Sequence, residues 1–398
     1  LKVVPYHVHR SKAVALRVCK GAGLRCGCAT AEPSNKVKEK MLLEEVPIAV
    51  DSFNHSQPGI SFFCSHAHDD HLSGLSGSWA RGTIHCSATT AKLLAMRWPA
   101  LATRLRPLQL GTTHRLYIGG TQEMNGLPVD VLLVDAHHVP GSVMFLFSGY
   151  FGNILYTGDF RLHGDHAALA WHPEVQRAGL ARVFLDNTFC HPMFSHPSRE
   201  TLEQSIIAKA LERWPCLIFV SVYKLGKESL LSALAQRLQT KVYVSAQRAR
   251  SLGALGLPSM LIAVQRQEAA NCDINELYRM SVEGCVWAVP QKDVRPAVER
   301  AATNGAASFG VIPTGWAGNR KRKLDEEDED TWVQEVPYSD HSSFMELVQF
   351  LDWLPVAPVT FISPVPLEPG PFSYNGEEGV QELGALTQAP CISYKVLP

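Results

Sequence analysis

The stretch from His66 to His71 places three imidazoles and two carboxylates within six residues. Burying so many polar groups together is costly unless a cation pairs with them, and imidazole with carboxylate is a ligand set that suits zinc. Alternate side chains of an extended segment point the same way, so His66 and His68 can share one metal ion. Asp70 and His71 come one turn later and can face a second ion. The H-x-H-x-D-H spacing therefore predicts a metal site.

Further candidate ligands follow apolar runs elsewhere in the chain. Two metal ions need more ligands than one segment offers, and functional residues commonly lie on loops that a rigid sheet holds in place. The motifs at these positions are Asp51, Asp135–Ser142 with His137 and His138, Thr157–Arg161 with Asp159, Asp186, and Pro337–Ser343 with His341. Thr-Gly-Asp is a weak signal by itself, but the motifs in this order predict a di-metal hydrolase.

The elements that carry these residues are short strands. From residue 47 onward apolar runs alternate with polar turn signals, which predicts strands at 60–64, 129–134, 143–147, 153–157 and 183–185. Between about 198 and 305, helical spacing at 198–214 and 227–238 alternates with strand-like runs at 217–220 and 241–244. This alternation predicts a compact α/β insert, after which strand character returns at 309–313.

Composition limits the class of protein. The 398 residues are 46% hydrophobic and 19% charged, which is typical of a globular chain with a sizeable core. A net charge of −1 excludes a broadly basic nucleic-acid coat but leaves room for a local basic groove. No run approaches the roughly 18–20 consecutive apolar residues of a membrane span. Ten widely scattered cysteines do not form the pattern of a secreted disulfide scaffold.

The motifs H-x-H-x-D-H, D-A-x-H-x-P-G-S and T-G-D-F-R, in this order, resemble those of the metallo-β-lactamase fold. Additional motifs make the chain similar, over about residues 47–365, to the β-CASP branch that repairs DNA cross-links. They are Leu185–Thr188, Val222–Glu228, Ile312–Trp316 and Tyr338–Ser343. Within that branch, the K-L-G-K-E stretch and P-Y-S-D-H-S-S favour the 5′ exonuclease group over the structure-specific endonuclease group.

The resemblance implies an α/β fold, a four-layer αβ/βα metallo-β-lactamase sandwich with an inserted α/β β-CASP domain. We expect the hydrolase domain at 41–200 and again at 309–365, because the candidate ligand His341 follows the insert at 201–308. Residues 1–40 are expected to be a disordered extension or a gene-model artefact, with a transit peptide as the alternative. Residues 366–398 are expected to form a flexible tail.

The resemblance also implies two sets of ligands. One metal ion would be held by His66, His68, His138 and Asp159, and a second by Asp70, His71, His341 and the shared Asp159. His137 is the alternative to His138. Asp51 and Asp186 would orient ligands and tune bound water, so the expected catalytic residues are Asp70, His71, Asp159, Asp51 and Asp186. The cofactor would be one or two zinc ions, with Mg²⁺ or Mn²⁺ as alternatives at the second site.

Residues around His341 are candidates for substrate binding. The hydroxyl and N–H donors that suit a terminal phosphate belong to Thr314, Gly315, Ser339, Ser342 and Ser343. The resemblance implies that they form a pocket for a 5′-phosphate, whereas ordinary turn chemistry is the alternative. Lys224 and Lys227, with Arg248 and Arg250, would line the adjacent groove.

Together these features predict a metal-dependent 5′-to-3′ DNA exonuclease acting on 5′-phosphorylated ends. It would hydrolyse phosphodiester bonds with a metal-activated hydroxide, in interstrand cross-link repair and telomere-end processing, with β-lactamase activity as a side reaction. Three alternatives stay open: a structure-specific endonuclease, an RNA-processing β-CASP nuclease and a non-catalytic repair scaffold.

The segment 319–330 breaks the pattern of the chain. A basic run, Arg320, Lys321, Arg322 and Lys323, precedes six consecutive acids, which predicts a disordered charged loop. The basic run is a candidate nuclear import signal, and a solvated linker is the alternative. We expect a nuclear protein without a membrane segment. Its partners would be DNA with 5′-phosphorylated ends and DNA-repair or telomere-binding proteins, although Tyr394–Pro398 is only loosely similar to a telomere-protein docking motif.

Overall fold

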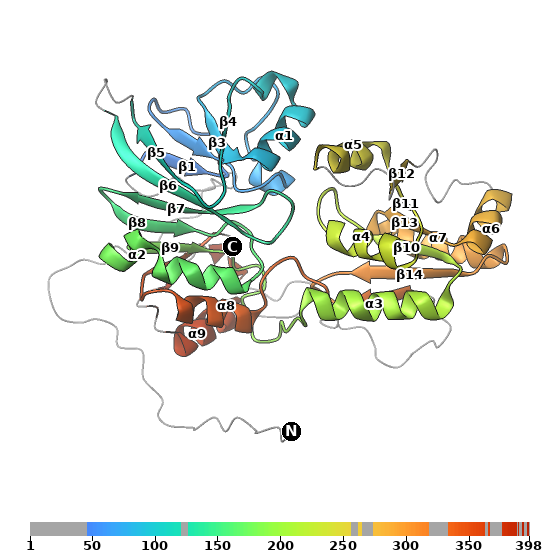
Figure 1. Cartoon of the computed structure of the whole chain (residues 1–398). Helices are drawn as coiled ribbons and strands as arrows, with labels where there is room; N and C mark the ends of the chain where they lie inside the picture. The colour runs from blue at the N-terminus through green and yellow to red at the C-terminus, as the bar shows by residue number, and fades with distance from the viewer. Residues whose placement is uncertain are drawn as a thin grey trace, which may run out of the picture. The chain divides into compact units, whose positions relative to one another are not determined.

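The computed structural model describes residues 46–120, 126–255, 262–264, 274–317, 333–362, 365–366, 376–387, 389, 392–393 and 396–397 (Figure 1). All of them belong to one compact unit, Lys38–Pro398. The expected extension 1–40, the charged loop 319–330 with its import signal, and most of the tail 366–398 lie outside the described residues. Within the described part, no helix is both long and apolar enough to cross a membrane.

Two sheets form the hydrolase part of the fold. A parallel four-stranded sheet has the order β1-β2-β3-β4, with bounds Ile48–Val50, Ser61–Phe63, Ile84–Ser87 and Leu105–Leu108. A seven-stranded sheet has the order β18-β16-β9-β8-β7-β6-β5. From β5 to β9 its strands are Thr113–Ile118, Leu127–Asp135, Val143–Gly149, Gly152–Tyr156 and Arg182–Leu185, and β16 and β18 are Val359–Phe361 and Ile392–Ser393. Its antiparallel ladders join β5 through β8, and parallel pairing takes over from β8 to β18.

The two sheets face one another across a shared apolar core. Phe63 of β2 packs its ring against Phe145 and Phe147 of β7, with ring centroids 5.4 and 4.9 Å apart. The alternate residues of β7, Met144 and Leu146, point to the opposite face and join a second core. Because side chains of a strand alternate between faces, an apolar run that is buried on both sides must be covered by two layers.

Helices supply the outer layers of the sandwich. Helix α1 (Ala88–Arg97) covers the four-stranded sheet, and its Leu94 shares a core with Phe62 and Trp79. Helix α8 (Phe344–Trp353) covers the seven-stranded sheet through Leu347 and Phe350, and α2 (Pro173–Ala178) and α9 (Gly376–Leu386) contribute to the same core. Short 3-10 helices span Asp69–His71, Pro99–Leu101 and Gly164–Trp171. The order helix, sheet, sheet, helix is the expected αβ/βα sandwich (Figure 1).

The insert is a parallel sheet covered by helices on both faces. Its order is β12-β11-β13-β10-β14-β15, with β10 to β15 at Leu217–Ser221, Val242–Val244, Ile262–Val264, Cys285–Val289, Ser308–Pro313 and Val333–Val336. Its helices α3 to α7 span Arg199–Arg213, Glu228–Arg237, Ala246–Ala254, Ile274–Glu283 and Gln291–Thr303. Helices α3 and α4 contribute to one core of the insert and α7 to the other. A separate pair of strands joins β17 (Val365–Pro366) to β19 (Val396–Leu397).

One expected boundary differs in the structure. Residues 309–365 were expected to belong to the hydrolase domain throughout. Instead β14 pairs with β10 in parallel, Phe309 opposite Ile218, and β15 pairs with β14. The sheet of the insert therefore continues to Val336, and the chain returns to the hydrolase part with α8. The apolar run at 309–313 identified a strand, but strand pairing over some 90 residues is decided by tertiary packing and leaves no local signal.

Candidate metal centre

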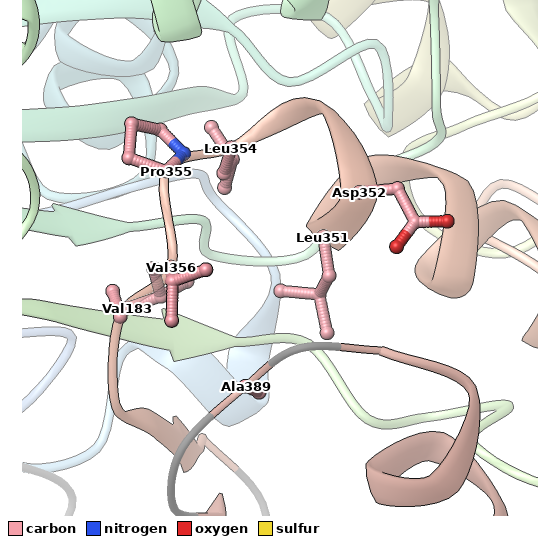
Figure 2. A pocket seen from close by; sticks show the side chains of 8 residues that line it. Val183, Leu351, Asp352, Leu354, Pro355, Val356 and Ala389 are labelled. Carbon is pink, nitrogen blue, oxygen red and sulfur yellow. The ribbon is translucent and has the colours of Figure 1, made fainter.

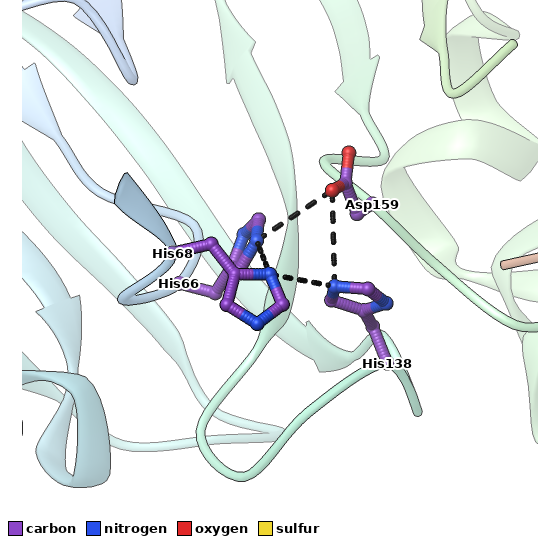
Figure 3. A group of neighbouring side chains, drawn as sticks. All are labelled: His66, His68, His138 and Asp159. Carbon is purple, nitrogen blue, oxygen red and sulfur yellow. Dashed lines mark hydrogen bonds and ion pairs between the residues drawn. The ribbon is translucent and has the colours of Figure 1, made fainter. Parts of the chain in front are cut away.

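Three imidazoles and one carboxylate converge at the ends of β2, β6 and β8 (Figure 3). His68 Nδ1 lies 3.1 Å from His66 Nε2 and 3.1 Å from His138 Nε2. Asp159 Oδ2 lies 3.6 Å from the same atom of His66 and 3.7 Å from that of His138. Ligand atoms at 2.0–2.1 Å from a tetrahedral zinc ion would be about 3.3–3.4 Å apart. The four atoms are therefore spaced as the donor set of a metal ion would be.

Tight turns bring these residues together. His66 and His68 follow β2, His138 lies in the loop from β6 to β7, and Asp159 follows β8. Gly158 has a φ of 55°, and a Cβ at this position would lie 2.9 Å from the Cβ of Ser65. Only glycine combines a left-handed backbone with this close approach, so the Thr-Gly-Asp motif fixes how Asp159 reaches the cluster.

A second group of ligand atoms shares Asp159 with the first. His71 Nε2 lies 3.2 Å from Asp159 Oδ2 and 3.5 Å from Asp70 Oδ2. On the other side, donor atoms of Asp159, Asp186 and His341 lie within 4.8 Å of one another. The seven residues expected to bind metal thus meet around a single carboxylate, although they come from segments as far apart as His66 and His341.

The remaining ring nitrogens of these histidines contact carboxylates, hydroxyls and backbone carbonyls. His71 Nδ1 lies 2.9 Å from Asp51 Oδ2, and His341 Nδ1 lies 2.9 Å from Asp186 Oδ2. The other contacts are His66 Nδ1 with Ser65 Oγ at 2.9 Å, His138 Nδ1 with the Asp340 carbonyl at 2.9 Å, and His68 Nε2 with the Leu225 carbonyl at 3.3 Å. Such contacts hold each ring with its other nitrogen toward the cluster. Asp51 and Asp186 lie where residues that orient ligands are needed.

Burial and charge set the protonation of the cluster. Burial lowers the pKa of His66 well below its ordinary value, and burial together with His341 lowers the pKa of His138 to about 3. Burial alone would lower the pKa of His71 too, but Asp159 and Asp51 raise it to about 10. Burial alone would raise the pKa of Asp159, yet His71 and His341 hold it well below the usual range. Neutral His66 and His138 beside an ionised Asp159 are thus in the forms that bind a metal cation, whereas His71 must release a proton to bind one.

His137, the alternative ligand, points away from the cluster. Its Nε2 lies 3.2 Å from the Asp165 carboxylate, and its ring stacks on His163 with centroids 4.2 Å apart. His137, Asp165 and His166 form a further group of potential ligand atoms. However, His166 Nδ1 accepts the backbone N–H of His163, and its Nε2 lies 2.8 Å from the Asp135 carbonyl oxygen. Both nitrogens of His166 are thus engaged in local hydrogen bonding.

The hydroxyl groups expected to form a phosphate pocket make hydrogen bonds within the chain. Ser339, Ser342 and Ser343 are 2%, 2% and 4% exposed. The Ser339 hydroxyl donates to the His341 carbonyl, that of Ser342 to the Phe160 carbonyl, and that of Ser343 to the Glu346 carboxylate. The Thr314 hydroxyl accepts the Trp316 N–H, and the carbonyl of the buried Gly315 lies 2.9 Å from His196 Nε2. These groups shape the turns that carry His341, which is the turn chemistry named above as the alternative.

The expected basic residues are placed differently from one another. The Lys224 side chain is 60% exposed and forms an ion pair with Asp69. Lys227 is largely buried, with Nζ 3.0 Å from Asp340 Oδ2. Arg248 is buried as well and cannot line a groove, because its guanidinium donates to backbone carbonyls and to Glu228. Of these three residues, Lys224 is the one that remains accessible to a ligand.

Arg161 is a residue of the site that the sequence analysis did not single out. Its side chain is 4% exposed and donates to the carbonyls of Ser339 and Pro197, both at 3.1 Å, and to Glu346 at 3.0 Å. It therefore ties the segment before His341 to the chain that leads into α3. Its place in the T-G-D-F-R motif was the available signal.

A separate cavity of about 100 Å³ lies at the end of α8 (Figure 2). It is lined by Val183, Leu351, Asp352, Leu354, Pro355, Val356, Ala357 and Ala389. Asp352 is the single charged residue in this lining, and none of the clustered histidines contributes to it. This cavity is therefore distinct from the cluster around Asp159.

Comparisons with known proteins agree on one family. Residues 288–368 match the family described as DNA repair metallo-beta-lactamase. The chain is 36% identical over 311 residues to the 5′ exonuclease Apollo of Gallus gallus, which covers 77% of this chain and 60% of that relative. It is 35% identical over 316 residues to the protein of the same name from Rattus norvegicus, covering 78% and 52%. The DNA cross-link repair protein SNM1 of Arabidopsis thaliana is 29% identical over 325 residues, covering 78% and 63%. The matched region thus spans between about half and two thirds of each relative.

Proposed function

This chain belongs to the metallo-β-lactamase/β-CASP family of DNA repair nucleases, and from that premise we propose that it is a metal-dependent 5′ exonuclease acting on DNA. The observation that carries the proposal is the convergence of four donor atoms at the ends of the hydrolase strands, with four of their separations between 3.1 and 3.7 Å and all of them within 4.8 Å. Two relatives are named as 5′ exonucleases and one as a cross-link repair protein. We propose the same reaction for this chain, in the repair of interstrand cross-links.

The donor atoms fit a divalent metal ion, and the proposed metal at the first position is zinc. His66, His68, His138 and Asp159 would hold it, since nitrogen-rich sets with one carboxylate are typical of zinc. A second ion, zinc or else Mg²⁺ or Mn²⁺, would be held by Asp70, His71, His341 and the shared Asp159, since Asp70 and His71 form one group of ligand atoms with Asp159 and His341 forms another with the same carboxylate. Bound divalent ions supply an acidified water and stabilise the charge of a phosphoryl group.

The residues of the chain prepare the site for such ions. Asp159 is kept ionised by the neighbouring His71 and His341. Asp51 and Asp186 hold the rings of these two histidines through their Nδ1 atoms, which leaves Nε2 as the nitrogen that would bind a metal ion. The Asp70 side chain is 70% exposed, which leaves the second position open to solvent and to a substrate. Lys224, exposed beside the cluster, is the residue proposed to attract a backbone phosphate.

The proposed substrate is DNA with a 5′-phosphorylated end, and the proposed compartment is the nucleus. The serine hydroxyls near His341 are buried and hydrogen-bonded within the chain. The preference for that end is therefore supported by the likeness to the named 5′ exonucleases.

A time course with purified, zinc-loaded protein tests the proposal. Single- and double-stranded DNA oligonucleotides, labelled at either end, are compared with and without a 5′-phosphate, beside RNA of the same sequence. We expect stepwise loss of nucleotides from the 5′ end and slower cleavage of the unphosphorylated strand. Internal cuts in hairpin DNA would favour a structure-specific endonuclease, and faster cleavage of RNA would favour RNA processing. Absence of cleavage by metal-loaded protein would reject the nuclease.

A further inference from the structure

Tyr223 is an exposed aromatic residue directly beside the candidate metal centre. Its side chain belongs to the segment between β10 and α4, and the residue is 60% exposed although Leu225, two positions on, is buried. The ring centroid of Tyr223 lies 5.7 Å from that of His68, with the ring planes at 77°. His68 supplies one of the four clustered donor atoms. A large π surface is thus presented to solvent next to the position where a phosphodiester would meet the metal.

The backbone that carries this ring is fixed from within the insert. The Arg248 guanidinium donates to the carbonyl of Tyr223 at 2.6 Å and to that of Gly226 at 2.6 Å. The same guanidinium pairs with Glu228 at 2.8 Å, and both charged side chains are less than a tenth exposed. Because buried groups hold the backbone at Tyr223, the backbone loses little conformational entropy when a ligand contacts the ring.

The chemistry around Tyr223 fits a nucleotide. Every nucleobase has a π face, and stacking on an exposed aromatic side chain tolerates all sequences. The adjacent Lys224, exposed and paired with Asp69, carries an ammonium group that can also attract a phosphate, and the ring of Tyr223 contacts His68 of the cluster. Resting on the nuclease function proposed above, we propose that Tyr223 stacks against the base of a nucleotide adjoining the scissile phosphodiester. The residue thereby binds the strand and aligns it with the metal centre.

The test is a cycle that removes the side chain, the base or both. Wild-type and Tyr223→Ala proteins, zinc-loaded and full length, are assayed on a 5′-phosphorylated oligonucleotide and on the same oligonucleotide with abasic residues at its first two positions. We expect Tyr223→Ala to lower kcat/KM on the intact strand about 5- to 100-fold, the range that base stacking on aromatic rings supports. On the abasic strand the same substitution should cause little further loss. Tyr223→Phe, which keeps the ring, should rescue most of the activity on the intact strand.

Tyr150 provides a matched control. It is 59% exposed, lies at the turn between β7 and β8, and contacts the ring of Phe151, so Tyr150→Ala should cleave both strands like wild type. Unchanged zinc content and melting temperature show that Tyr223→Ala is folded. Equal losses on intact and abasic strands, or no loss on either, would overturn the stacking role. If the wild type cleaves no DNA, the nuclease proposal fails separately. Fluorescence anisotropy of the intact and abasic strands then decides whether Tyr223 binds bases.

Discussion

Asp159 is the residue at which the two groups of ligand atoms meet. Its Oδ2 lies 3.2 Å from His71 Nε2 and 3.6 Å from His66 Nε2. Burial alone would raise its pKa, but the surrounding imidazoles hold it well below the usual range and keep the carboxylate ionised. A negative charge at the shared position would compensate the charge of two neighbouring cations, which imidazoles that have released their protons to bind metal cannot do.

Asp70→Ala should abolish cleavage and leave the fold intact. Asp70 lies 3.5 Å from His71 Nε2, yet its side chain is 70% exposed. Replacing an exposed side chain changes the free energy of unfolding by no more than about 0.5 kcal/mol. Loss of residues that merely orient metal ligands lowers activity 10- to 100-fold, so loss of a ligand should lower cleavage at least about 100-fold. Cleavage rates and urea unfolding measure both quantities.

The neighbouring Asp69 serves as the control for this substitution. Its carboxylate pairs with Arg97 and Lys224 and belongs to neither group of ligand atoms. Asp69→Asn should therefore leave the metal content unchanged. Full nuclease activity in Asp70→Ala would contradict the assignment of the second metal position.

Asp51→Asn should weaken metal binding although Asp51 is not a proposed ligand. Its carboxylate accepts hydrogen bonds from the N–H and hydroxyl of Ser65 and lies 2.9 Å from His71 Nδ1. The Asp51 carboxylate orients His71 and raises the basicity of its ring. Loss of such a group typically lowers metal affinity 10- to 100-fold. Competition with a chelator measures the change. The control is Asp130→Asn, because the Asp130 carboxylate pairs with the exposed Arg115 away from the cluster. Equal metal retention by both variants would refute the role of Asp51.

The sequence predicted which residues meet in the cluster better than it predicted the roles of polar groups around it. The candidate ligands are indicated by residue type and spacing, as in His66-x-His68, and in the structure they lie close together. Ser342 offered no such signal. Whether a serine hydroxyl faces a substrate or a carbonyl depends on a partner distant in sequence, here Phe160, and only the fold reveals that partner.

At the scale of elements, the segment between β10 and α4 depends on a buried ion pair. Arg248 of α5 pairs with Glu228 at the start of α4, and its remaining donors hold two carbonyls of the segment. A buried charge that loses its partner is strongly unfavourable. The pair therefore determines the path of a loop that contains Tyr223, Lys224 and Leu225.

Arg248→Met should destabilise the protein by about 3–5 kcal/mol, because it leaves the Glu228 carboxylate buried without a cation. The measurement is the free energy of unfolding in urea. The double substitution Arg248→Met with Glu228→Leu removes both charges and should recover much of the loss. If the single variant is as stable as wild type, the pair does not support the loop.

Elements were predicted well wherever local pattern determines them. The helical spacing at 198–214 corresponds to α3 at Arg199–Arg213, and that at 227–238 to α4 at Glu228–Arg237. Ser198 accepts the Thr201 N–H at the start of α3, which is the capping contact that such a boundary requires. The strand predicted at 309–313 is present as β14, but its place in the sheet of the insert was not predicted because pairing with β10 has no local signature.

At the scale of the whole molecule, residues of the insert contact the segments that carry the ligands. The Leu225 carbonyl lies 3.3 Å from His68 Nε2, and Lys227 pairs at 3.0 Å with Asp340, the neighbour of His341. Ligands on both sides of the insert in sequence, His68 and His341, are thus held in part by the insert itself. A metal ion that binds all these segments should stabilise the folded chain as a unit.

Removing the metal should lower the stability of the whole protein. A ligand that binds only the folded state stabilises it by about 4 kcal/mol at a free concentration 1,000 times its Kd. Dialysis against a chelator should therefore lower the urea midpoint and the melting temperature, and added zinc should restore both. The slope of the urea transition should stay the same if the folded state without metal keeps its compact form.

A variant that lacks ligands separates metal binding from other effects of the chelator. In His66→Ala with His138→Ala, all four of the closest contacts between donor atoms are lost, so zinc should no longer raise the melting temperature. The chelator should likewise leave that variant unchanged. If wild type unfolds at the same temperature with and without the chelator, and retains no metal in either condition, the cluster holds no ion. The imidazoles around Asp159 would then form a buried hydrogen-bonded network, and the chain would lack the metal that the proposed hydrolysis requires.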